Sequence, residues 1–252
     1  MMRSFRWALG SLLLILVGVI QPAHADGPPA HHWGYSGEES PAHWGDIAAV
    51  CAKGQAQSPI GFNSRGAITK GPFPKMEIDW QPTVTGEAVD NGHTIQVNVP
   101  PGNFLVYGGT RYELKQFHFH SPSEHNVNGE HTAMEMHFVN QTPEGKTAVL
   151  GVLLTTGRAN AGLEPIFSAL PPPGGTPKTV QVDLQSLLPK DRTHFAYAGS
   201  LTTPPCTEGV QWLVIVAQPE ISKAQVDAFH ARYPANARPT QAWHGRKISI
   251  AP

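Results

Sequence analysis

Apolar and polar residues alternate through the middle of the chain, which predicts β-strands. In residues 93–99, Ile95, Val97 and Val99 fall on one face and polar side chains on the other. Two segments are apolar on both faces, which predicts central positions in a sheet. The expected strands beyond the first are 111–120, 132–139, 147–155 and 210–217.

A capping box and a hydrophobic staple predict one helix near the C-terminus. Ser222 and Gln225 form the capping box, and Ile221 and Val226 form the staple around it. We expect the helix to end near Tyr233, because a proline follows.

The remaining pattern indicates a single domain. Residues 161–170 are a second helix candidate, and the proline- and glycine-rich stretch 171–175 predicts a surface loop. We find no internal repeat and no linker, so residues 26–252 are expected to form one domain with a large sheet and peripheral helices.

Residues 1–25 have the features of a secretory signal peptide. Arg3 and Arg6 precede an apolar run over 8–20, and Ala23-His24-Ala25 is a small-x-small cleavage site. An uncleaved anchor is the alternative, although the run is short for a membrane span. We expect a periplasmic or secreted protein with no membrane span after cleavage. Loss of the two arginines changes the formal net charge from −1 to −3, which gives no basis for binding nucleic acid.

The chain contains two cysteines, Cys51 and Cys206. An even number of cysteines in an exported protein favours a disulfide, which would tether the nearby segment with Thr202 and Thr203. Two buried free thiols are the alternative.

The dipeptide Asn128-Gly129 predicts a hairpin between two of the expected strands. Both positions of a type I′ turn need positive φ, which Gly and Asn adopt at least cost. With these residues as the loop, Val127 pairs with Glu130. Pro122 cannot donate to the ladder and is compatible with a bulge, so the register near it stays open.

Three histidines share one face of this hairpin. The register of the turn places His120 directly opposite His137, and the two-residue period of a strand adds His118 and Gln116 to that face. Neutral imidazole is a favoured ligand of Zn²⁺, and three protein ligands leave a fourth position for water. Gln116 and Glu135 are expected to hold the ring nitrogens that do not bind metal. The plainer alternative is a pair of polar histidines on a half-solvated strand.

Four segments resemble the α-class carbonic anhydrases: 116–120, 123–125, 135–137 and 197–206. The resemblance extends over essentially the whole mature chain. It implies a mixed α/β, mainly β fold, with a large, mostly antiparallel ten-stranded central sheet and short peripheral helices. The implied activity is that of a lyase, the reversible hydration of carbon dioxide to bicarbonate and a proton by zinc-bound hydroxide.

The resemblance also implies the roles of individual residues. His118, His120 and His137 would bind Zn²⁺, His93 would carry the proton to solvent, and Thr202 would accept a hydrogen bond from zinc-bound hydroxide while donating to Glu124. His125 would brace Glu135. An apolar pocket for carbon dioxide and a water path complete the site; the pocket is implied for Val139, Val149, Leu201, Thr203, Val210 and Trp212, and the path for Tyr35, Asn91 and Gln96.

The orientation of His93 and the choice between rival functions stay open in the sequence. Strand parity alone would place His93 on the side of Ile95 and Val97, unless the preceding Asn-Gly turn rotates it. Sulfonamide inhibitors and a homodimer are family expectations. A catalytically silent binding or adhesion module and an exported zinc buffer are the rival functions. The other histidines are expected to be surface or structural residues: His31, His32, His43, His131, His194, His230 and His244.

Overall fold

The computed structural model describes residues 32–63, 68–69 and 73–252. The expected signal peptide and His31 lie outside the described residues. Residues 32–252 form one compact unit. No helix within the described ranges is long and apolar enough to cross a membrane.

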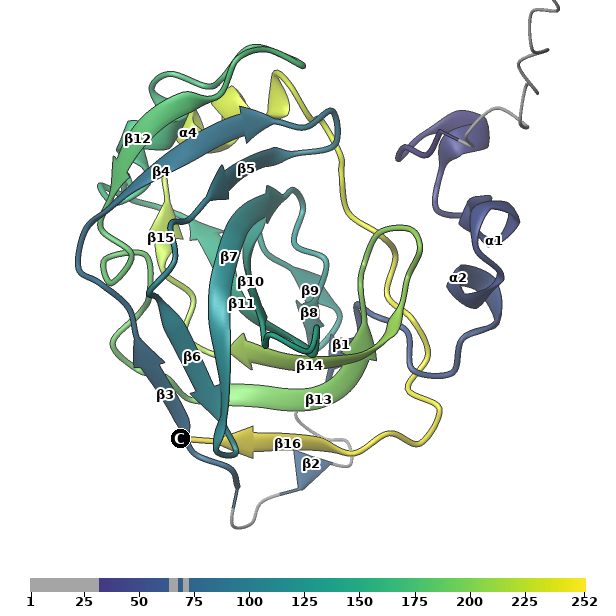
Figure 1. Cartoon of the computed structure of the whole chain (residues 1–252). Helices are drawn as coiled ribbons and strands as arrows, with labels where there is room; N and C mark the ends of the chain where they lie inside the picture. Colours follow the sequence, from purple (N-terminus) through teal and green to yellow (C-terminus); the bar gives the residue numbers. More distant parts are fainter. Residues whose placement is uncertain (1–31, 64–67, 70–72) are drawn as a thin grey trace, which may run out of the picture. The chain divides into compact units, whose positions relative to one another are not determined.

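A 13-stranded sheet organises the described chain (Figure 1). Ten of its strands form one continuous path: β12 (Lys178–Val182), β4 (Val84–Asp90), β5 (Ile95–Asn98), β7 (Thr110–His120), β10 (Met134–Gln141), β11 (Thr147–Thr156), β14 (Glu208–Ile215), β13 (His194–Ser200), β16 (Ile248–Ala251) and β2 (Ile68–Thr69). Off this path lie β3 (Met76–Asp79), β6 (Phe104–Tyr107) and β15 (Glu220–Ile221). Along the path β11–β14 and β16–β2 are parallel and the other neighbours antiparallel, which confirms the expected ten-stranded, mostly antiparallel sheet.

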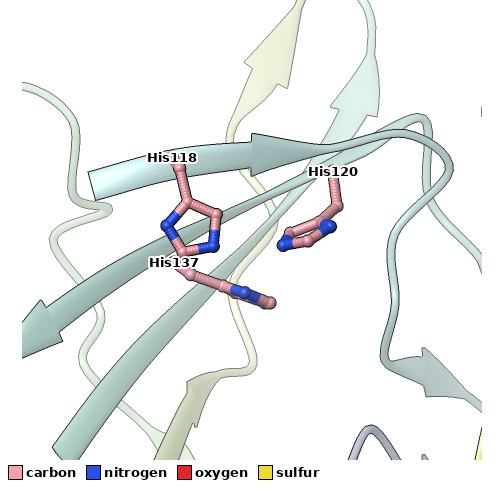
Figure 2. Close-up of side chains that lie close together, drawn as sticks. All are labelled: His118, His120 and His137. Carbon is pink, nitrogen blue, oxygen red and sulfur yellow. The ribbon is translucent and has the colours of Figure 1, made fainter. Parts of the chain in front are cut away.

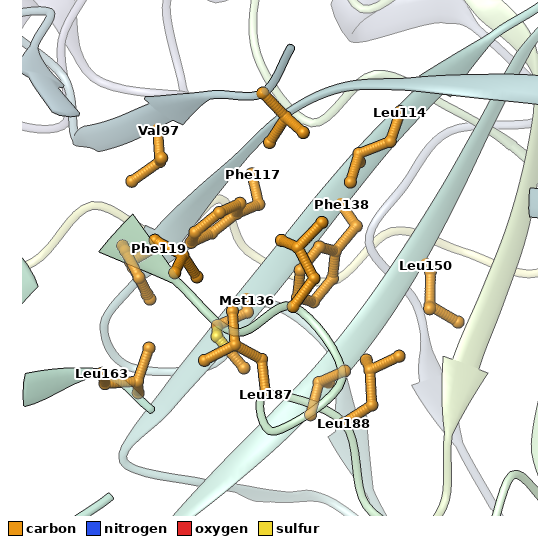
Figure 3. Close-up of a cluster of buried hydrophobic side chains, with 14 of the residues drawn as sticks. Val97, Leu114, Phe117, Phe119, Met136, Phe138, Leu150, Leu163, Leu187 and Leu188 are labelled. Carbon is orange, nitrogen blue, oxygen red and sulfur yellow. The ribbon is translucent and has the colours of Figure 1, made fainter. Parts of the chain in front are cut away.

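The two strands that are apolar on both faces lie inside the sheet, as predicted. β11 lies between β10 and β14, and β14 between β11 and β13. One face of the sheet carries the larger core, with Phe117, Phe119, Met136 and Phe138 fully buried (Figure 3). The side chains between them along β7 and β10 point to the opposite face, which therefore receives the histidines.

The predicted hairpin turn is confirmed. Asn128 and Gly129 have φ of 54° and 88°, and Val127 pairs with Glu130. The two short strands on either side of this turn, β8 (Asn126–Val127) and β9 (Glu130–His131), belong to a separate three-stranded sheet with β1 (Gly61–Phe62).

Farther from the turn, the predicted register is wrong by two residues. His137 lies opposite His118, not opposite His120. The cause is the unequal length of the two sides of the hairpin, because five residues (121–125) separate His120 from Asn126, whereas three residues (132–134) separate their partners His131 and Glu135. A shift by two residues preserves the face of every side chain, so the three histidines still share one face.

Short helices lie outside the sheet. The helix α4 (Lys223–His230) has Ser222 as its N-cap with the predicted capping box. It ends at His230, earlier than predicted, and residues 231–232 form a turn before Tyr233. The second candidate, 161–170, contains only the single turn α3 (Glu164–Phe167). The other helical segments are η1 (Gly37–Glu39), α1 (Trp44–Ile47) and α2 (Ala49–Lys53).

Cys51 and Cys206 form a disulfide, so the alternative of two free thiols is excluded. The bond links α2 to the segment that follows β13, across 155 positions of sequence. Trp44 packs against both cysteines in a small cluster of buried residues. The segment with Thr202 and Thr203 is therefore tied covalently to the N-terminal helices.

Candidate active site

His118 and His120 project from β7 and His137 from β10, and the three rings point toward one another (Figure 2). Their ring centroids are 5.0 Å (His118–His120), 5.3 Å (His118–His137) and 4.6 Å (His120–His137) apart. One nitrogen from each ring lies within 4.8 Å of the other two. His120 and His137 are buried and His118 is partly exposed, so the group forms the floor of an open site.

Acceptor oxygens fix the protonation of two of these rings. His118 Nδ1 is 2.8 Å from Gln116 Oε1, and His137 Nε2 is 2.9 Å from Glu135 Oε1. Amide and carboxylate oxygens only accept, so His118 carries its proton on Nδ1, and the nearby carboxylate favours a proton on His137 Nε2, although the two groups are not aligned as a hydrogen bond. The lone pairs of His118 Nε2 and His137 Nδ1 remain available. The structure thus places Gln116 beside His118 and Glu135 beside His137.

The third ring is held by the main chain. His120 Nδ1 donates to the carbonyl oxygen of Asn236 at 2.7 Å, which leaves Nε2 with its lone pair. This Nε2 is buried and has no hydrogen-bond partner among the described residues. An unpaired buried acceptor is costly, and a cation bound between the three lone pairs would satisfy it. The donor set of three neutral imidazoles fits Zn²⁺.

Burial keeps the three imidazoles neutral. It lowers the pKa of His118 well below its usual value and lowers that of His137, while the pKa of His120 falls to about 4. The neighbouring histidines add to the effect at His118, because positive charges at this distance disfavour one another. All three rings are thus ready to bind a cation at neutral pH.

Glu135 connects the histidines to the protein interior. Its Oε2 accepts from the backbone amides of Glu124 and His125 at 2.9 and 2.8 Å, and its Oε1 lies 2.8 Å from His125 Nδ1. Burial acts to raise the pKa of Glu135, but His125 and His137 hold it well below its usual value. His125 Nε2 in turn lies 2.7 Å from the Tyr197 hydroxyl. His125 therefore lies between Glu135 and Tyr197 and contacts both.

Glu124 lies behind the three rings. Its Oε1 accepts from the Arg238 backbone amide at 2.8 Å, and its Oε2 lies 3.6 Å from His120 Nε2. Burial raises the pKa of Glu124 to about 7, although the neighbouring His137, the backbone hydrogen bond from Arg238 and the Thr202 side chain act to lower it. Thr202 thus lies close to Glu124, whose Oε2 is buried and has no hydrogen-bond partner among the described residues.

His93 lies at the edge of the same site. It precedes β5 in a turn in which Asn91 Oδ1 accepts from the amides of His93 and Thr94, each at 3.0 Å. Strand parity would place His93 on the side of Ile95 and Val97. That prediction is wrong, because the turn directs the ring into the cavity that Gln96 also lines. The imidazole stacks on Trp33, with ring centroids 3.6 Å apart. Burial, and then His32, lower the pKa of His93.

A cavity of about 120 Å³ joins His93 to the histidine cluster. Asn91 and Gln96 line it and are linked by a hydrogen bond of 3.3 Å. The cavity therefore gathers the three residues of the expected water path and Thr203, which was expected in the apolar pocket. Its lining comprises Trp33, Tyr35, Asn91, His93, Thr94, Gln96, Gln116, His118, His120 and Thr203.

An apolar cluster packs against His137 through Trp212. Trp212 is buried, and its ring lies edge-on to His137 at 4.8 Å. The other residues expected to form the apolar pocket belong to the same cluster: Val139, Val149, Leu201 and Val210.

Two residues of this site were missed in the sequence. Asn236 binds His120 through its carbonyl oxygen, and Arg238 binds Glu124 through its amide and Cys51 O through its guanidinium. Main-chain contacts leave no residue-type signal, so neither role could be deduced from composition or spacing.

Comparisons with known proteins identify the family. The family described as eukaryotic-type carbonic anhydrase matches residues 39–251. The carbonic anhydrase of Neisseria gonorrhoeae is 40% identical over 223 residues, covering 86% of this chain and 87% of that protein. Two solved structures are similar as well: an α-carbonic anhydrase from Thermovibrio ammonificans with the inhibitor sulfanilamide, and one from Photobacterium profundum. Each has a TM-score of 0.82, is 40% identical and covers 86% of this chain. The match covers 98% of the first structure and 100% of the second. The chain belongs to the eukaryotic-type, or α, carbonic anhydrase family of enzymes.

Proposed function

We propose that this protein catalyses the reversible hydration of carbon dioxide to bicarbonate and a proton at a Zn²⁺ site formed by His118, His120 and His137. The observation that carries the proposal is the set of three imidazole lone pairs, one from each ring, within 4.8 Å of one another. When bound, Zn²⁺ supplies a Lewis acid that lowers the pKa of a coordinated water, which is an established property of carbonic anhydrases.

Thr202 orients the nucleophile in this proposal. In this role the Thr202 hydroxyl group donates its proton to Glu124, which is fully buried, so that the hydroxyl oxygen accepts from the reacting group. A Thr202 oxygen that only accepts would favour a reacting group whose O–H points toward Thr202. The remaining lone pairs of that reacting group would then have a fixed direction. The apolar wall around Trp212 offers carbon dioxide a site without polar competitors.

His93 exports the proton in this proposal. It lines the cavity that reaches His118 and His120, and histidine is the side chain best suited to exchange protons near neutral pH. A lowered pKa leaves the ring neutral and able to accept. Asn91 and Gln96 order the water between the two groups.

We further propose export to the periplasm or the medium, and inhibition by sulfonamides. The disulfide is consistent with an oxidising compartment. A related enzyme from Thermovibrio ammonificans was solved with sulfanilamide, and this chain is 40% identical to it.

Stopped-flow hydration of carbon dioxide by the mature protein, with zinc stoichiometry measured on the same sample, tests the proposal. We expect about one zinc per chain, activity inhibited by sulfanilamide, and loss of both zinc and activity in His118→Ala. His131→Ala, a histidine outside the cluster, is the matched control. Zinc binding without hydration would favour a zinc buffer, and full activity well below half occupancy would contradict the three-histidine site.

A further inference from the structure

Asn236 is a fully buried residue that contacts two parts of the active site. It follows α4, in the loop that passes behind β7. Its main chain pairs with Ser121, since Asn236 N donates to Ser121 O at 3.0 Å, and its carbonyl oxygen accepts from His120 Nδ1. The backbone of this one residue therefore orients a metal ligand.

The side chain of Asn236 makes a second set of contacts. Its Nδ2 donates to His93 O and to Phe119 O, each at 3.0 Å, while Oδ1 accepts from Ser121 N at 2.8 Å. The carboxamide thus binds the turn that carries His93 and the end of the strand that carries His120.

We propose that Asn236 is a positioning residue that fixes the His93 turn and the His120 imidazole relative to each other. The distance between the proton acceptor and the cation site then stays constant. The inference rests on the proposed function for the role of His93. Few side chains fit the position, because it requires donors to two carbonyl groups and an acceptor for one amide. Aspartate lacks the donors, and glutamine adds a methylene to a buried site.

Asn236→Asp tests the proposal with little change in volume. The new carboxylate oxygen faces the carbonyl oxygens of His93 and Phe119, so both contacts become repulsive. Asn103→Asp is the matched control, because Asn103 is also fully buried and bonds Pro100 O and Gln81 N, and none of its hydrogen bonds reaches His93 or His120.

Three measurements apply to both variants: the unfolding midpoint, the zinc Kd by chelator competition, and kcat at saturating zinc with and without imidazole. For Asn236→Asp we expect the zinc Kd to rise about 10- to 100-fold and kcat to fall, with imidazole restoring much of kcat. For Asn103→Asp we expect only a lower midpoint. The proposal is overturned if Asn236→Asp keeps the parental Kd and imidazole response, or if both variants change these quantities equally.

Further measurements keep the test decisive if Asn236→Asp does not fold. Asn236→Ser retains one donor, and we expect a smaller change in both zinc Kd and imidazole response. In the unmutated, metal-free protein, ¹H–¹⁵N NMR should show His120 protonated at Nδ1 and slow exchange of the Asn236 carboxamide protons; an Nε2–H tautomer or fast exchange overturns the proposal. If the unmutated protein lacks hydration activity, the proposed function fails, while zinc Kd and NMR still decide the role of Asn236.

Discussion

The imidazole of His93 lies flat against the indole of Trp33, with ring centroids 3.6 Å apart and planes inclined by 8°. The contact covers one face of the ring and holds it at the edge of the cavity that leads to His118. The position of the proposed proton acceptor therefore depends on an aromatic residue near the beginning of the described chain.

Trp33→Ala should raise the pKa of His93 toward the usual histidine value, because the substitution exposes the ring and removes the burial that lowers the pKa. ¹H NMR titration of the His93 ring protons measures the change. Trp33→Phe, which keeps an aromatic face, should move the pKa less. An identical titration curve in Trp33→Ala would show that the indole contributes nothing.

Glu135→Gln should weaken zinc binding about 10- to 100-fold, because the buried carboxylate that accepts from both His125 and His137 is replaced by a neutral amide. Chelator competition gives the Kd. Glu208→Gln is the control, since Glu208 also accepts two hydrogen bonds, from Ala56 and Gln57, but does not contact the histidines. Equal affinities of the two variants would contradict this role of Glu135.

Thr202→Val should lower kcat/KM for carbon dioxide hydration by about 100-fold and leave the zinc content unchanged, because the substitution keeps the volume and removes the hydroxyl group. Stopped-flow kinetics with metal analysis measures both. Thr142→Val, at another buried threonine, should have parental kinetics. A parental kcat/KM in Thr202→Val would exclude an orienting role for the hydroxyl.

Protonation of the three histidines should weaken zinc binding little at pH 6.5 and strongly as the pH approaches 4. The folded-state pKa values of the metal-free histidines are depressed, to about 4 for His120, so protons compete with the metal only in acid. The same depression means that protonation favours unfolding, so the stability of the metal-free protein falls as the pH drops from 6.5, the ordinary histidine value, toward 4. A loss of zinc affinity below pH 6.5 as steep as that expected for histidines of ordinary pKa would contradict these pKa values.

Reduction of the disulfide between Cys51 and Cys206 should lower the free energy of unfolding by up to about 5 kcal/mol, because the bond closes a loop of 155 positions. Urea unfolding with and without reductant measures the difference. The double variant Cys51→Ser/Cys206→Ser should match the reduced protein and be insensitive to reductant. A reduced protein as stable as the oxidised one would refute the prediction.

Much of the fold and site could be predicted from local sequence patterns. The turn at Asn128-Gly129, the capping box at Ser222 and the internal positions of β11 and β14 each depend on neighbours in sequence or on simple periodicity. The common face of the three histidines depends only on side-chain alternation. The prediction of that face is therefore correct although the predicted register is wrong by two residues. The pairing of the cysteines followed from their number.

Other features depend on contacts that sequence patterns do not encode. The orientation of His93 is set by a turn in which a side-chain oxygen of Asn91 replaces strand hydrogen bonds. The exact partner of His137 depends on the lengths of two connections, and the support of His120 comes from a main-chain carbonyl group 116 positions away. Each of these becomes visible only when distant segments are packed together.

The hairpin tip and the histidine strands belong to different sheets, joined by connections of unequal length. The tip is therefore mechanically separate from the metal ligands: its loop at Asn128-Gly129 lies where the chain can be extended or fused to another protein without resetting the alignment of β7 and β10.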